Sequence, residues 1–287
     1  MSRIEEALKK ATKRRGEEAV STRPSVSSSH CSDGLERPAA KSPSSKSIPQ
    51  EVLDRVKNQH MLVAMNDVVS PAAEEFRKLK QNLVRLTKKD GFQNTILITS
   101  GTVGEGKSVT AVNLAISLAQ EFDHTVLLVD ADLRRPSCGN LLCMDTSYGL
   151  SDCLLGGTDI STAMIRTGIG KLSFLPAGTP MANPGELLAS KRMDDVLREI
   201  KGRYSDRYVI IDTPPVLPFA EARTLARLAD MVVLVVKEGR LSKYELGETL
   251  EALSGANVAG VVYTHASEAS TSNRYSGYAK YKYYSAS

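Results

Sequence analysis

The chain has 287 residues, of which 41% are hydrophobic and 24% charged, as in a globular domain with a buried core. Its net charge of +4 is too small to indicate nucleic-acid binding. The longest strongly apolar run, residues 231–236, is far shorter than the roughly 20 residues that cross a bilayer, and the charged N-terminus carries no apolar signal segment. We therefore expect a cytoplasmic protein that binds no nucleic acid.

The N-terminal part of the chain differs in composition from the rest. Residues 1–19 place Ile4, Leu8 and Ala11 at helical spacing among charges, which predicts a short amphipathic segment. It is either a solvated terminus or a docking segment for a partner or a membrane surface. Residues 20–58 are for the most part rich in serine and proline, so they bury too little apolar surface to offset the entropy cost of ordering. We predict a disordered linker there.

A change of pattern marks the globular domain, residues 59–266, which precedes a flexible tail, residues 267–287. Short β-branched runs alternate with helical periods, and this predicts a doubly wound α/β fold with a mostly parallel sheet and helices on both faces. The expected strands are Thr95–Thr99, Thr125–Asp130, Leu172–Pro176, Tyr208–Asp212, Met231–Val236 and Val258–Tyr263. The expected helices are 107–121, 186–201, 219–228 and 242–254.

A glycine-rich segment, GTVGEGKS, lies between the first expected strand and helix and fits G-x-x-x-x-G-K-[ST] without a mismatch. Gly104 and Gly106 can adopt positive φ, which lets backbone N–H groups close around phosphate oxygens at a helix N-terminus. Lys107 is expected to reach the β- and γ-phosphates and Ser108 to ligate Mg²⁺. We predict a nucleotide-binding loop made of Gly101, Thr102, Val103, Gly104, Glu105, Gly106, Lys107, Ser108 and Val109.

Aspartates follow two of the expected strands. Asp130 ends one of them and is followed by Asp132, while Asp212 ends another. Because ligands bind outside the carboxyl ends of the strands in open α/β sheets, we expect these carboxylates beside the phosphate loop. A buried aspartate is costly without a partner, and Mg²⁺ would supply one. A single aspartate in such a place can also cap a turn.

Each of these side chains is given a role by its chemistry. Ser108 and Asp212 are assigned to the metal, and Asp130 to the metal or its water shell. Asp132 is the candidate base that accepts a proton from an attacking hydroxyl, and Arg134 can stabilise charge on a transferring phosphoryl group. The cysteines and histidines lack the paired spacing of a zinc or redox motif, and we expect them to be structural.

These motifs together resemble a known family. The segments SGTVGEGKS, VLLVDADLRRP and VIIDTPP, followed by a tyrosine-rich end, are similar to the bacterial tyrosine kinases of exopolysaccharide synthesis and export, and MSRIEEALKKA resembles their XrtA-associated branch. The likeness implies a P-loop NTPase fold similar to partition ATPases, with ATP and Mg²⁺ as cofactors and Lys107, Asp130, Asp132 and Arg134 as catalytic residues. Partition ATPases lack the Asp-x-Asp-x-Arg arrangement and carry lysine where this chain has Thr102.

The resemblance also implies a ring of identical subunits. Family members carry Glu-x-x-Arg-x-x-Arg on a helix used for self-association, and Glu74 and Arg77 match this pattern while Lys80 replaces the final arginine. Lysine keeps the charge but cannot make the bidentate contact of arginine. A solvated charged helix face is the alternative. The last strand of the family usually ends in an asparagine that reads adenine, and Thr264 stands there.

Half of the ten tyrosines lie in residues 273–287, at Tyr275, Tyr278, Tyr281, Tyr283 and Tyr284. By the likeness, these tyrosines accept the γ-phosphoryl group of ATP from a neighbouring subunit, and the added negative charge loosens the ring. The likeness further implies a membrane polysaccharide co-polymerase as activator and a location peripheral to the membrane. The alternatives are a partition-type regulatory ATPase and a non-catalytic scaffold that docks through residues 1–15.

Overall fold

The computed structural model describes the following residues: 50–66, 70–88, 91–144, 147–204 and 206–267. The predicted amphipathic segment 1–19 lies outside them. The five tyrosines of the tail also lie outside the described residues: Tyr275, Tyr278, Tyr281, Tyr283 and Tyr284.

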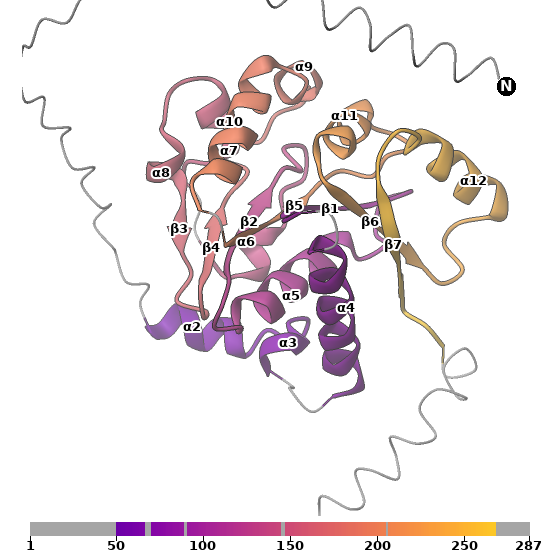
Figure 1. The fold of residues 1–287 in the computed structure, drawn as a ribbon, viewed down its shortest axis with the longest axis horizontal. Helices are drawn as coiled ribbons and strands as arrows, with labels where there is room; N and C mark the ends of the chain where they lie inside the picture. The colour runs from indigo at the N-terminus through magenta and orange to yellow at the C-terminus, as the bar shows by residue number, and fades with distance from the viewer. Residues whose placement is uncertain (1–49, 67–69, 89–90, 145–146, 205, 268–287) are drawn as a thin grey trace, which may run out of the picture. The chain divides into compact units, whose positions relative to one another are not determined.

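A seven-stranded sheet of order β3-β4-β2-β5-β1-β6-β7 forms the centre of the described residues (Figure 1). Its strands are β1 (Thr95–Ser100), β2 (Thr125–Asp130), β3 (Ile165–Arg166), β4 (Leu172–Leu175), β5 (Arg207–Asp212), β6 (Met231–Lys237) and β7 (Val258–Thr264). Every neighbouring pair is parallel except β3 and β4. The six predicted strands are confirmed, and the two-residue β3 is too short to leave a pattern in the sequence.

Helices cover both faces of the sheet (Figure 1), as the predicted doubly wound fold requires. The first layer contains α2 (Gln50–Lys57), α3 (Val63–Asn66), α4 (Pro71–Thr87), α5 (Lys107–Ala119) and α6 (Cys138–Leu141). The second contains α7 (Leu150–Leu154), α8 (Ile160–Ala163), α9 (Gly185–Leu188), α10 (Lys191–Gly202), α11 (Ala220–Leu228) and α12 (Lys243–Ala252). No helix among these is long and apolar enough to cross a membrane.

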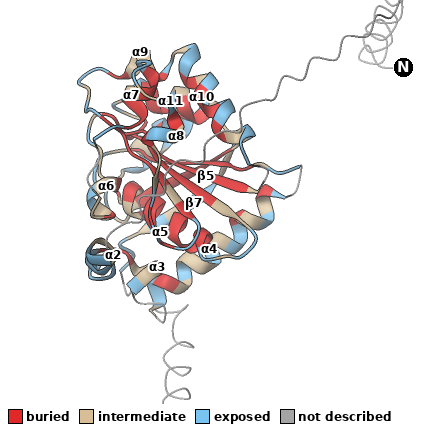
Figure 2. Cartoon of the chain, turned by 90° about the vertical axis from the view of Figure 1, so that its left-hand side faces the viewer, coloured by how far each residue is buried: buried red, intermediate tan, exposed pale blue. Residues whose placement is uncertain are grey.

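The central strands are buried on both faces, and Figure 2 shows them enclosed between the helical layers. In β1, Ile96 and Ile98 belong to the core under the first helical layer, whereas Leu97 belongs to the core under the second. Burial of alternate residues in two different cores explains why such strands read as continuous apolar runs. It also leaves the carboxyl ends of the strands as the place where polar side chains gather.

Two predicted boundaries are wrong. Residues 50–57 form α2, whose Val56 is fully buried in the core of the first layer, so the linker predicted over 20–58 ends before this helix. The single helix predicted over 186–201 is divided into α9 and α10. It is divided because Ser190 has an extended ψ of 155° and its hydroxyl caps α10 by accepting the Met193 N–H.

Two glycines test the packing of this fold. A Cβ at Gly149 would lie 2.2 Å from the backbone atoms Gly178 N and Pro176 O, whereas a Cβ at Gly247, inside α12, would meet nothing within 4 Å. We expect Gly149→Ala to lower the free energy of unfolding by about 2–3 kcal/mol through overpacking. Gly247→Ala is expected to raise it by about 0.5–1 kcal/mol, because alanine loses less backbone entropy in a helix. Urea unfolding of both variants measures this, and similar effects at the two sites would contradict it.

Candidate nucleotide and phosphoryl-transfer site

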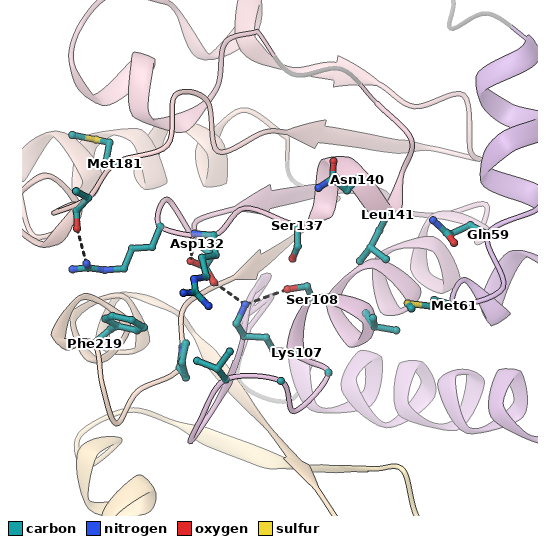
Figure 3. Close-up of a pocket in the computed structure, with 18 residues that line it drawn as sticks. Gln59, Met61, Lys107, Ser108, Asp132, Ser137, Asn140, Leu141, Met181 and Phe219 are labelled. Carbon is teal, nitrogen blue, oxygen red and sulfur yellow. Dashed lines mark hydrogen bonds and ion pairs between the residues drawn. The ribbon is translucent and has the colours of Figure 1, made fainter. Parts of the chain in front are cut away.

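A cavity of about 780 Å³ opens where β1, β2 and β5 end (Figure 3). Its volume suits a small-molecule ligand. The lining comes from the loop before α5 and the start of that helix, from the segments after β2, β4 and β5, and from the segment between α2 and α3. It consists of Gln59, Met61, Val103, Gly104, Gly106, Lys107, Ser108, Val109, Asp132, Arg134, Arg135, Ser137, Asn140, Leu141, Met181, Ala182, Pro215 and Phe219.

The glycine-rich loop has the backbone that was predicted for it. Gly104 and Gly106 adopt φ values of 83° and 93°, and Gly106 directly precedes α5 as its N-cap. This geometry turns the chain sharply into the helix, whose first N–H groups have no partner within it and carry partial positive charge. The loop is therefore built to receive an anion.

Glu105 holds this loop in place from inside. Its side chain is fully buried, and Oε1 accepts hydrogen bonds from Thr102 N at 2.5 Å and Thr102 Oγ1 at 3.1 Å. Oε2 accepts from Lys237 N, at the end of β6, at 3.2 Å. The backbone oxygen of Glu105 accepts from Thr264 Oγ1, at the end of β7, at 2.8 Å. The loop is thus fixed to the last two strands as well as to α5.

Lys107 and Asp132 line the cavity, and the buried Asp130 and Asp212 lie close to them. In Figure 3 the lysine points to Asp132 and Ser108. Its Nζ lies 2.8 Å from Asp132 Oδ2 and 3.8 Å from Asp212 Oδ2. The pairing of β2 with β5 sets Asp130 beside Asp212. The carboxylates of Asp130, Asp132 and Asp212 therefore lie close together, as the sequence predicts.

Burial and charge shift the pKa values of this cluster. Burial raises the pKa of Asp130 to about 7, and the neighbouring Asp212 carboxylate adds to the rise. Burial also raises the pKa of Asp212, against the effect of Lys107. For Lys107, burial alone would lower the pKa, but Asp212 and Asp132 outweigh it and raise the pKa above its usual value. The cluster favours a charged lysine, and it disfavours the charged forms of Asp130 and Asp212 unless a cation offsets their burial.

A divalent cation fits the donor set found here. Asp212 is fully buried, yet its Oδ1 has no hydrogen-bond partner among the described residues. An unpaired buried carboxylate oxygen costs free energy that a metal ion would recover. Ser108, whose hydroxyl accepts a 3.2 Å hydrogen bond from Lys107, supplies a second oxygen beside it. Oxygen donors of this kind are the ligands that Mg²⁺ prefers.

The Asp130 carboxylate is held by backbone groups as well. Oδ1 accepts a hydrogen bond from Asp132 N at 3.2 Å, and Oδ2 accepts from Ser137 N and Cys138 N at 3.1 and 3.0 Å. These bonds fold the segment after β2 around the carboxylate. They direct Asp132 back toward Lys107.

Arg134 lies on the cavity wall, where other groups engage its guanidinium. Nε donates to Glu221 Oε1 at 2.5 Å, Nη1 donates to Ala182 O at 2.6 Å, and the group stacks 4.6 Å from the centre of the Phe219 ring. Glu221 is almost fully buried in α11, so this pair is well defined. The exposed Arg135, which also lines the cavity, was not singled out from the sequence.

The charged residues predicted for self-association lie on α4. Ser70 caps this helix by accepting the Ala73 N–H. Glu74 and Arg77 pair with each other at 2.5 Å along one turn. Lys80 instead pairs with Glu121, after α5, at 3.0 Å.

Cys138 is a site residue that the sequence did not reveal. It is fully buried, and its Sγ lies 3.5 Å from Asp212 Oδ2. A lone cysteine with no partner at metal-site spacing carries no signal of such a role in the sequence. Only the turn after β2, closed on Asp130, brings the thiol to the end of β5.

Comparison with known proteins places this geometry in a family. A family model described as an AAA domain matches residues 93–256. Tyrosine-protein kinase YwqD of Bacillus subtilis (strain 168) is 36% identical over 196 residues, which are 68% of this chain and 81% of the relative. Tyrosine-protein kinase CpsD of Streptococcus agalactiae is 33% identical over 212 residues, 72% of this chain and 90% of the relative.

A solved structure shows the same likeness in three dimensions. The kinase domain of the Escherichia coli tyrosine kinase ETK superposes with a TM-score of 0.66 at 30% identity, covering 72% of this chain and 82% of that one. The residues that the family model matches, 93–256, lie within the α/β domain. The P-loop NTPase fold predicted from the sequence is confirmed.

The raised pKa of Asp130 has a measurable consequence. A carboxyl whose pKa is higher in the folded chain stabilises it fully below the unfolded pKa near 3.8 and loses this effect as the pH rises through about 7. We expect the Asp130 carboxyl carbon to titrate near pH 7 in ¹³C NMR spectra. Its signal should be missing from Asp130→Asn and retained in Asp152→Asn, a control at α7. Titration of every aspartate below pH 5 would contradict this.

Proposed function

This chain belongs to the bacterial tyrosine kinases, and from that premise we propose that it transfers the γ-phosphoryl group of ATP to tyrosines of its own C-terminal tail. The observation that carries the proposal is the position of Lys107 between Asp132 and Asp212 at the floor of the cavity. The lysine lies where phosphates enter, and an acceptor for a hydroxyl proton lies directly beside it.

The loop and the lysine hold the phosphates of the nucleotide. Backbone N–H groups around Gly104 and Gly106 and the N-terminus of α5 surround the phosphate oxygens, and Lys107 neutralises the β- and γ-phosphates. Ser108 and Asp212 would hold Mg²⁺, with Asp130 beside them. When bound, that ion neutralises charge on the phosphates. Thr264, at the position of the asparagine that reads adenine in the family, donates its hydroxyl to Glu105 O of the loop.

Asp132 is placed to accept the proton of the incoming tyrosine. As its proton passes to the carboxylate, the tyrosine oxygen forms a bond to the γ-phosphorus, and the bond between this phosphorus and the β–γ bridging oxygen breaks to leave ADP. The negative charge of ATP draws Lys107 toward the phosphates and frees Asp132 Oδ2 for this task. Arg134, held by Glu221, borders the same cavity and stabilises charge on the transferred group.

The tail tyrosines Tyr275, Tyr278, Tyr281, Tyr283 and Tyr284 are the proposed acceptors. The rest of this tail holds basic and small side chains. A role as phosphate acceptors gives the hydroxyls of the clustered tyrosines a chemical purpose. Each phosphotyrosine adds about −1.5 to −2 charges, so modification converts the tail from basic to acidic. A regulatory switch follows from that change of sign.

We further propose that transfer occurs between subunits of a ring, with the α4 residues Glu74, Arg77 and Lys80 at the contact. The pairing of Glu74 with Arg77 and of Lys80 with Glu121 supports an ordered charged surface on this helix. By family resemblance, a membrane polysaccharide co-polymerase is the proposed activator, and exopolysaccharide polymerisation and export are the proposed process. Residues 1–19 are the proposed docking segment.

Phosphotyrosine formation that depends on Lys107 distinguishes this function from that of a regulatory ATPase. We expect Lys107→Met to abolish phosphotyrosine on the purified chain, since the phosphates lose their cation, while Lys171→Met, a substitution outside the cavity, leaves it unchanged. Incubation with ATP and detection by a phosphotyrosine antibody make the measurement. Wild-type chain that hydrolyses ATP without acquiring phosphotyrosine would favour the ATPase.

Loss of the tail tyrosines tests the acceptor. Replacing Tyr275, Tyr278, Tyr281, Tyr283 and Tyr284 by phenylalanine is expected to remove most phosphotyrosine, because the hydroxyl is the acceptor, and to leave ATP binding intact. The matched control is phenylalanine at Tyr244 and Tyr263, which are 74% and 52% exposed on the domain itself. Mass spectrometry locates the modified residues. Unchanged labelling of the tail variant would exclude the tail from the reaction.

A further inference from the structure

The Cys138 thiol is part of the carboxylate cluster at the ends of β2 and β5. One ligand atom from each of Asp130, Cys138 and Asp212 can be chosen so that all three lie within 4.8 Å of one another. Cys138 joins the two carboxylates directly, because its N–H donates to Asp130 Oδ2 at 3.0 Å and its Sγ lies 3.5 Å from Asp212 Oδ2. All three side chains are buried.

A second observation indicates that this cluster is built for a cation. Asp212 Oδ1 is buried with no hydrogen-bond partner among the residues described, and Lys107 Nζ is 3.8 Å from the other oxygen of that carboxylate. Lys107 also pairs closely with Asp132, so one ammonium group serves several buried carboxylates. The Asp212 carboxylate thus meets the thiol and Lys107 through Oδ2 and keeps Oδ1 available to a cation.

We propose that Asp130, Cys138 and Asp212 form a site for a thiophilic divalent cation such as Zn²⁺ or Cd²⁺. Zn²⁺ binds thiolate sulfur at about 2.3 Å and carboxylate oxygen at about 2.0–2.2 Å, and a tetrahedral arrangement separates two such ligands by about 3.5 Å. The Cys138–Asp212 separation of 3.5 Å matches this value. Binding replaces the S–H bond by a sulfur–metal bond and releases the thiol proton to the buffer. Water or a phosphate oxygen completes the coordination.

The ligand set distinguishes this site from the one proposed for Mg²⁺. Mg²⁺ takes oxygen ligands and keeps several waters, whereas thiolate favours softer ions. Asp130 and Asp212 belong to both sets, so the two ions compete for the same carboxylates. Zn²⁺ at Cys138 is therefore an inhibitor of phosphoryl transfer that competes with Mg²⁺, and the thiol makes the kinase sensitive to zinc.

Cd²⁺ alone is the probe that tests the site without any need for kinase activity. The full-length chain with serine at Cys31, Cys143 and Cys153 keeps Cys138 as its single thiol. We expect Cd²⁺ to give the ultraviolet charge-transfer band of a Cd–thiolate bond in this chain. The band should vanish when Cys138→Ser is added. Asp212→Asn or Asp130→Asn should weaken Cd²⁺ binding at least about tenfold, since each removes a ligand.

Other outcomes overturn the proposal. A band of equal strength in the chain without Cys138 would place the metal elsewhere, and a band unaffected by both aspartate substitutions would indicate a lone thiolate. Thermal unfolding of each variant establishes that it is folded. If one of the two aspartate variants does not fold, the other still tests the site.

A kinase assay provides the functional arm. Added Zn²⁺ is expected to inhibit the wild type at least about tenfold more strongly than Cys138→Ser, at equal Mg²⁺. Equal inhibition of the two chains would refute competition at this site. A chain that shows the Cd²⁺ band but no phosphoryl transfer at all would retain the metal site and refute the proposed kinase function, so the two failures are distinguishable.

Discussion

The structure depends on the burial of several carboxylates around one ammonium group. Asp130, Asp132 and Asp212 are all at most 4% exposed, and Lys107 is the cation that contacts two of them. Such a cluster adds little to the free energy of unfolding, because the cost of desolvating the charges is about as large as their mutual attraction. Its carboxylate oxygens are instead donors of the kind that a divalent cation binds. The backbone N–H groups that bind Asp130 keep the cluster together.

The sequence predicts those parts of the site that depend on local pattern. The loop before α5 needs glycines at fixed positions, and Gly104 and Gly106 adopt the positive φ values expected of them. The parallel strands are continuous apolar runs because both faces are buried, so their ends could be placed to within a few residues. Once the strands are placed, topology alone brings Asp130 and Asp212 to the same edge. No side-chain detail is needed for that step.

Contacts between distant residues could not be predicted in this way. Glu105 binds Lys237 across 132 positions, Arg134 binds Glu221 across 87, and Cys138 meets Asp212 across 74. Each pair depends on loop paths that no short pattern encodes. The break between α9 and α10 was missed for a different reason. A helical period continues through it, and the cap of Ser190 overrides that period locally.

The anchoring of Ser267 sets a length scale for the proposed transfer to the tail. Its N–H and hydroxyl bind Glu238, whose own N–H donates to Thr264 O at 3.0 Å, so the chain leaves the domain from a fixed point. A fully extended chain spans at most about 3.5 Å per residue. Tyr275 therefore lies within about 28 Å of Ser267, and Tyr284 within about 60 Å. The proposed acceptors thus differ in their greatest possible distance from Ser267. A proposed acceptor tyrosine that is few residues from Ser267 meets an active site at higher effective concentration only if that site lies near Ser267.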